Sequence, residues 1–139
     1  MLPTVATRAL PLLLVACGAL LGCGDQGPSD DEQVRATLAR FERATAAGDY
    51  AALCEEVLAR RLVDAVERTG LPCEEALAKG FEDVEEPRLA VGAVTVQGDT
   101  ATAEVRSSAQ GQRASDDSVE LVRESAGWRI ASLGPGVAP

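Results

Sequence analysis

The chain has 139 residues, no histidine, and a formal net charge of −9 at pH 7 from 13 basic and 22 acidic residues. Nucleic-acid binding depends on neutralising phosphates with Lys and Arg, so this acidity excludes a nucleic-acid partner. The absence of histidine excludes every nucleophile–His–acid triad. The length that remains after an N-terminal leader suits one small domain with a single core.

The first 22 residues are typical of an export signal. Arg8 supplies the positive region, and the run from Ala9 to Leu21 supplies thirteen apolar residues. A permanent membrane-spanning helix needs ~20 such residues, so this run is too short to stay in the bilayer. We therefore expect residues 1–22 to be a leader that is removed after export.

The segment from Leu20 to Cys23 follows the apolar run and resembles a bacterial lipobox. The resemblance implies that the Cys23 thiol receives a diacylglycerol and that cleavage makes Cys23 the mature N-terminus. Residues 23–29 would then link the anchor to the domain, and two acyl chains suffice to hold it on the extracytoplasmic face of the membrane. Two alternatives are a plain secretory signal and cleavage at Cys17, which would leave an apolar stub and an odd number of cysteines.

A first helix is predicted from Ser29 to Gly48. Ser29 and Glu32 have the spacing of a capping box, and acidic residues in the first turn suit the helix dipole. Gly48 should end this helix, and Asp49 should cap the next one. The apolar stripe comprises Val34, Leu38, Phe41 and Thr45, and the outward positions are Arg35, Arg40, Glu42 and Arg43.

A second helix is predicted to continue from Asp49 to a break at residues 69–72, where Gly70 and Pro72 interrupt the pattern. A short third helix should run from Glu74 to about Phe81. The stripe of the second helix comprises Leu53, Val57, Leu58, Leu62 and Ala65.

After Pro87 the apolar period changes from helical to two, which predicts strands. Strands so close in sequence should pair as antiparallel hairpins. The predicted fold class is α+β, with N-terminal helices packed on one face of an antiparallel sheet of about four strands. The domain should cover residues 30–133, followed by a disordered tail over residues 134–139. The predicted strands are Leu89–Val96, Ala101–Arg106, Val119–Arg123 and Trp128–Leu133, with turns or loops at 97–99, 110–116 and 125–127.

Three short motifs together resemble the nuclear transport factor 2-like (cystatin-like, SnoaL-like) superfamily. They are Gly48–Tyr50 after the first helix, the hairpin Val96–Ala101, and the final strand segment Gly127–Ile130. The chain also resembles small bacterial lipoproteins of that superfamily. The resemblance implies a curved sheet wrapped around helices, forming a cone with a pocket at its wide end. The superfamily includes enzymes, binding modules and assembly domains, so the fold does not choose a function.

Cys54 and Cys73 remain as a pair if cleavage occurs before Cys23. An exported protein folds in an oxidising compartment, so we expect them to form a structural disulfide. Two separate buried thiols are the alternative. A zinc site is not expected, because two cysteines without histidine do not complete a tetrahedral shell.

Catalytic residues are not predicted. Some enzymes of the superfamily, such as ketosteroid isomerases, use a pocket carboxylate with a phenol or a protonated acid. Tyr50 is the phenol that this chain offers. Acidic candidates are Asp64, Glu104 and Glu120, although none is clearly placed in the predicted pocket. We expect no cofactor and no metal.

Four aromatic residues of the domain are expected in the core or, alternatively, as the lining of a pocket for a small apolar ligand. The acidic run at residues 82–86 is expected to be a solvated loop, and a contact with a basic partner is the alternative. Two functions stay open: a membrane-tethered, non-catalytic interaction domain with an envelope protein partner, and a carrier or sensor of a small apolar molecule. The four aromatic residues are Phe41, Tyr50, Phe81 and Trp128.

Overall fold

The structure is a computed structural model that describes residues 27–134. The predicted leader, both candidate lipidation residues Cys17 and Cys23, and residues 135–139 of the predicted tail lie outside the described residues. Across residues 27–134, no helix is both long and apolar enough to cross a bilayer.

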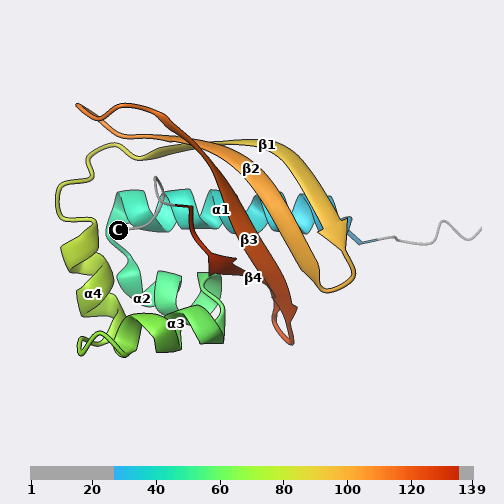
Figure 1. The fold of residues 1–139 in the computed structure, drawn as a ribbon, viewed down its shortest axis with the longest axis horizontal. Coiled ribbons are helices and arrows are strands. Elements are labelled where there is room, and N and C mark those ends of the chain that lie inside the picture. The colour runs from blue at the N-terminus through green and yellow to red at the C-terminus, as the bar shows by residue number, and fades with distance from the viewer. Residues whose placement is uncertain (1–26, 135–139) are drawn as a thin grey trace, which may run out of the picture.

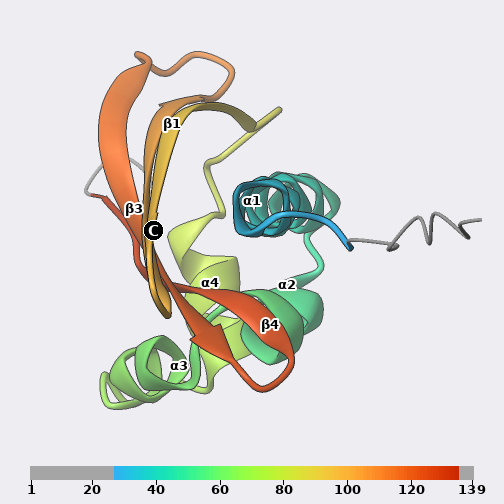
Figure 2. The same cartoon turned by 90° about the vertical axis from the view of Figure 1, so that its right-hand side faces the viewer.

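Helical segments come first in the chain and a four-stranded antiparallel sheet follows, with its strands in the order β1-β2-β3-β4. The helices lie on one face of the twisted sheet, and α1 runs beneath it (Figure 1, Figure 2). The predicted α+β fold class is therefore confirmed. The elements are α1 (Asp30–Ala47), α2 (Tyr50–Ala52), the π-helix η1 (Leu53–Val57), α3 (Arg60–Glu67), α4 (Cys73–Gly80), β1 (Arg88–Gln97), β2 (Thr100–Ser108), β3 (Ser115–Glu124) and β4 (Gly127–Ser132).

Both ends of α1 have the caps that the sequence predicts. The Ser29 amide donates to the Glu32 carboxylate at 2.7 Å, and the Ser29 hydroxyl accepts the Glu32 amide at 3.3 Å. Gly48 ends the helix in the left-handed region at φ 65°, where glycine carries no steric penalty. The Asp49 side chain then accepts the amide of Ala52 at 3.1 Å.

The prediction of one continuous second helix is wrong, because the helix is interrupted between Val57 and Arg60. The backbone is extended at Leu58 (φ −81°, ψ 142°), so the helical stretch divides into α2 with η1 and, after the break, α3. Leu58 forms a parallel bridge with Ile130, and the Ala59 amide donates to the Ile130 carbonyl at 2.7 Å. The break therefore gives the Ile130 carbonyl, at the free edge of β4, a hydrogen-bond donor. The local sequence does not reveal this break, because neither Gly nor Pro lies at residues 58–59.

The sheet buries one face against the helices. Gly98 at φ 61° forms the tight turn between β1 and β2, as predicted. Period-two alternation holds in β2 and β3, where buried residues alternate with exposed ones. The inward residues are small or branched, which brings the helices close to the sheet: Ala101, Ala103, Val105, Val119, Leu121 and Ile130.

Strand β1 is an edge strand that two side chains of α1 cover. The Glu42 carboxylate accepts the Leu89 amide at 2.6 Å, and the Arg35 guanidinium donates to the carbonyls of Val91 at 3.3 Å and Gly92 at 2.9 Å. The sequence pattern placed both side chains on the outward face of α1, so these contacts correct that prediction. Covering an edge in this way blocks unwanted strand pairing.

Candidate functional site

A disulfide joins the helical segments that lie beside β4. Cys54 of η1 and Cys73, the first residue of α4, are bonded, with their Cα atoms 6.2 Å apart. The predicted bridge is thus present in the structure. It closes a loop that contains α3, and α3 is held between the two bonded segments.

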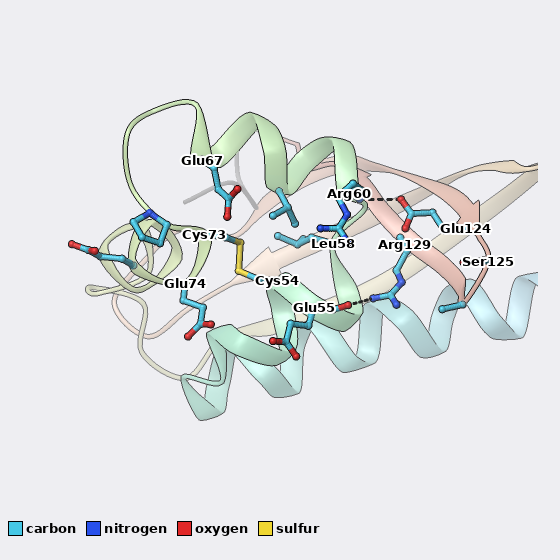
Figure 3. A pocket seen from close by; sticks show the side chains of 14 residues that line it. Cys54, Glu55, Leu58, Arg60, Glu67, Cys73, Glu74, Glu124, Ser125 and Arg129 are labelled. Carbon is cyan, nitrogen blue, oxygen red and sulfur yellow. Dashed lines mark hydrogen bonds between the residues drawn. A yellow bond between two sulfur atoms is a disulfide. The ribbon is translucent and has the colours of Figure 1, made fainter.

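A groove of about 700 Å³ lies against this disulfide. Figure 3 shows side chains from the helical segments on one side and from the β3–β4 turn on the other. The floor includes the buried residues Leu58 and Val63 together with the two cysteines. The remaining lining residues are Glu55, Arg60, Glu67, Pro72, Glu74, Glu75, Glu124, Ser125, Ala126 and Arg129.

The groove carries more negative than positive charge, with five glutamates and two arginines in its lining. The Glu124 carboxylate accepts the backbone amide of Arg60 at 2.9 Å, and the Arg129 guanidinium donates to the backbone carbonyl of Glu55 at 2.9 Å. Arg129 therefore binds a carbonyl rather than neutralising a groove carboxylate. Within residues 27–134, four groove carboxylates have no hydrogen bond or ion pair: Glu55, Glu67, Glu74 and Glu75.

A second hollow of about 380 Å³ lies on the other side of the β3–β4 turn. It shares Ala126 and Arg129 with the groove, so the two hollows meet at this turn. Its charged residues Arg40 and Glu56 pair with each other at 2.8 Å. With the shared Arg129 as its other charged residue, the second hollow has no excess of negative charge, in contrast to the acidic groove.

A small hollow of about 110 Å³, here named the cone cavity, lies between α1, the α4–β1 connection and the end of β2. Phe41 and Phe81 line it and contact each other edge to face, with ring centroids 6.2 Å apart. Glu42 is the acidic residue of its lining, and its carboxylate already accepts the Leu89 amide. The cavity therefore has an apolar wall and no free carboxylate.

The other two predicted pocket aromatics lie elsewhere. Tyr50 stacks on Phe81 with centroids 6.4 Å apart, but it lines a separate surface hollow near α4. Trp128 lines the second hollow beside the β3–β4 turn and is 4% exposed. The structure therefore brings Phe41 and Phe81 to the cone cavity and places Tyr50 and Trp128 outside it.

Trp128 belongs to a polar cluster that fixes the start of α1 to the sheet. The Arg123 guanidinium lies 4.5 Å from the Trp128 ring centroid and pairs with Asp30 at 2.7 Å and Asp99 at 3.2 Å. The hydrogen bond from Arg123 lowers the pKa of the Asp30 carboxyl, and Asp30 in turn raises the pKa of Arg123. Sequence reasoning missed this cluster because its members come from four separate segments.

The acidic candidates for catalysis do not line the cone cavity. Glu104 and Glu120 are exposed, on the sheet face opposite the buried residues, and Asp64 is exposed on α3. The acidic run at residues 82–86 connects α4 to β1 and presents exposed carboxylates. Across residues 27–134, no group of three or more Cys, Asp or Glu side chains could hold a metal ion.

No family model and no curated protein matches the chain. Solved structures do resemble it, among them the following two. An NTF-2 like protein of unknown function from Silicibacter pomeroyi has a TM-score of 0.52 and 22% identity, covering 72% of this chain and 88% of its own. A protein from Kribbella flavida has a TM-score of 0.56 and 21% identity, covering 78% and 90%. These similarities extend to the fold alone, and the chain has a nuclear transport factor 2-like fold.

Proposed function

We propose that the protein is a lipid-anchored, extracytoplasmic domain that binds another protein of the bacterial cell envelope without catalysing a reaction. The leader and the lipobox-like segment ending at Cys23 support the anchor. Six residues separate Cys23 from Asp30, and an extended segment of that length reaches roughly 20 Å at most. The domain would therefore work close to the membrane surface.

The small volume of the cone cavity is the main reason to prefer an interaction domain over a carrier. Sites for small molecules and cofactors usually enclose ~300–1,000 Å³. The cavity beside Phe41 and Phe81 measures about 110 Å³, which is below that range. The groove beside the disulfide measures about 700 Å³, which is within that range, but exposed carboxylates line it, so it suits a polar protein segment better than an apolar small molecule.

A carrier of a small apolar molecule is the second candidate. The observation that favours it is the apolar wall of the cone cavity, which Phe41, Phe81, Val84 and Leu89 contribute. A ligand of this site would have only a few heavy atoms unless the cavity widened on binding. We therefore rank this function below the interaction domain.

Crosslinking in intact cells tests the proposal, followed by native mass spectrometry of the protein purified from its own membranes. We expect the protein to fractionate with membranes, to crosslink to one envelope protein, and to carry no bound small molecule. A Cys23→Ala variant should lose the anchor and leave the membrane fraction. An extra mass that survives buffer exchange, with no crosslinked partner, would favour the carrier instead.

A further inference from the structure

We infer that the acidic groove beside the Cys54–Cys73 disulfide, continued by the hollow beyond the β3–β4 turn, docks an extended segment rich in Lys and Arg. The inference rests on the proposed function, since the segment would belong to the envelope partner. It adds the surface that makes the contact and the chemistry that this surface recognises.

The charge of the groove selects a cationic occupant. Glu55, Glu67, Glu74 and Glu75 are exposed and have no partner within the described part of the chain. With five glutamates and two arginines the lining has a net charge of −3, so it attracts a cationic side chain. A segment with negative charge would instead be rejected.

The floor of the groove suits the stems of long basic side chains. Leu58 and Val63, which are 3% and 8% exposed, close the bottom of the groove next to the disulfide, and Pro72 and Ala126 add exposed apolar surface. Lys and Arg pack their aliphatic stems on apolar surface while their charged ends stay near polar groups. An apolar floor below an acidic rim therefore matches Lys and Arg better than a free metal ion or a small polar cation.

The walls of the groove are held by a disulfide and by hydrogen bonds within the chain itself. The disulfide joins η1 to α4, and the Leu58–Ile130 bridge holds the start of α3 against β4. On the opposite wall, Glu124 holds the Arg60 amide and Arg129 holds the Glu55 carbonyl. A preformed site loses less conformational entropy on binding than a flexible one, which favours recognition of a segment that is itself extended.

The shape of the surface favours a chain over a compact ligand. The groove and the second hollow meet at Ala126 and Arg129, so an extended segment can cross the β3–β4 turn and occupy both. Its basic residues would lie at the α4 end, and uncharged residues would lie beside α1, where Arg40 and Glu56 already pair and Arg129 disfavours another cation.

The acidic run at residues 82–86 provides a matched control. It also carries several exposed carboxylates, but it lies between α4 and β1, outside the residues that line the groove. A protein that attracts cations only through its total charge would respond equally to neutralisation at either place. Docking in the groove predicts an unequal response.

The test uses the full mature protein in a non-ionic detergent and a synthetic nonapeptide of alternating lysine and alanine as the probe. Calorimetry compares the wild type with two variants that each lose three charges. The groove variant carries Glu67→Gln, Glu74→Gln and Glu75→Gln, and the control variant carries Glu82→Gln, Asp83→Asn and Glu85→Gln. We expect affinity to fall about tenfold in the groove variant and less than about twofold in the control.

Circular dichroism should show that both variants remain folded, since all six positions are exposed. Chemical-shift changes on adding the peptide should fall on residues 54–75 and 124–129. Equal losses of affinity in the two variants, no loss in the groove variant, or shifts centred on residues 82–86 would overturn the inference.

Crosslinking in cells separates this inference from the proposed function. If the groove variant still captures the envelope partner at the wild-type level, the docking surface is wrong while the proposed function stands. If the wild type captures no partner but the peptide binds in the groove as expected, the proposed function fails and the groove's preference for cations stands.

Discussion

Helices α1 and α3 are held in the fold by different means. Most of α1's inward face is buried against the sheet, whereas α3 buries Val63 alone. Two links outside the helix hold α3 in place. The Leu58–Ile130 bridge precedes it, and the Cys54–Cys73 disulfide closes the loop that contains it. The buried residues of α1 are Val34, Leu38, Phe41, Ala44 and Thr45.

This difference separates the part of the molecule that provides stability from the part that carries the candidate site. Burial against the sheet stabilises α1 through the hydrophobic effect, which is distributed over many contacts. Local opening is easiest where few apolar contacts are buried. The groove lies in that second part, so its walls depend on a covalent bond and a few hydrogen bonds.

The largest effect should come from the α1 side of the comparison. Leu38 is fully buried, so Leu38→Ala removes apolar contacts and leaves a cavity. We expect the free energy of unfolding to fall by about 4 kcal/mol. Urea denaturation followed by Trp128 fluorescence measures this loss. A loss below about 1 kcal/mol would show that α1 does not provide the main packing.

Removing the disulfide should have a slightly smaller and more local effect. Replacing Cys54 and Cys73 by alanine frees a loop with a sequence separation of 19 residues, which costs about 3 kcal/mol on the chain-entropy model. Hydrogen exchange should rise first in α3 and at the start of α4, while β2 and β3 stay protected. Faster exchange in the sheet than in α3 would contradict the proposed division.

Loss of the N-terminal cap of α1 should lower the free energy of unfolding by less than removal of the disulfide does. Ser29→Ala removes the hydroxyl that accepts the Glu32 amide and breaks the capping box. We expect a loss of about 1 kcal/mol in the free energy of unfolding. Ser29→Thr keeps a hydroxyl that can accept the Glu32 amide and donate to the Glu32 carboxylate, so its stability in the same denaturation assay should stay near that of the wild type.

The smallest effect should be a dependence on pH below about 4. The pKa of Asp30 is lowered by the hydrogen bond from Arg123, so folding favours the ionised carboxylate. Its contribution is complete above the unfolded pKa and is lost as the pH falls through the lowered folded value. An NMR titration should place the midpoint of Asp30 below 3.8, and Arg123→Gln should raise it. A midpoint that Arg123→Gln leaves unchanged would contradict this assignment.

Local patterns were sufficient where a helix or hairpin depends on its own residues. The Ser29–Glu32 capping box, the Gly48 terminus and the Gly98 turn all lie where the sequence predicts them. The α+β class followed from the change of apolar period near Pro87, because helical and strand periods reflect the geometry of a single segment.

The candidate site was less predictable, because its parts come from distant segments. The pair Cys54 and Cys73 was identified from the export signal and the number of cysteines. The groove glutamates were not singled out, since exposed carboxylates on helices have an ordinary solvated role. Of the aromatics predicted to line a pocket, Phe41 and Phe81 meet at the cone cavity, while Trp128 packs under Arg123.

The sequence by itself determined the order of the elements, the ends of α1 and the tight turn between β1 and β2, because these depend on neighbouring residues. The tertiary structure alone decided where the second helix breaks. Ile130, more than seventy residues away, draws the backbone of Leu58 and Ala59 into pairing with β4. That break positions α3 as a wall of the acidic groove, and a hydrogen bond between residues so distant leaves no mark in the local pattern.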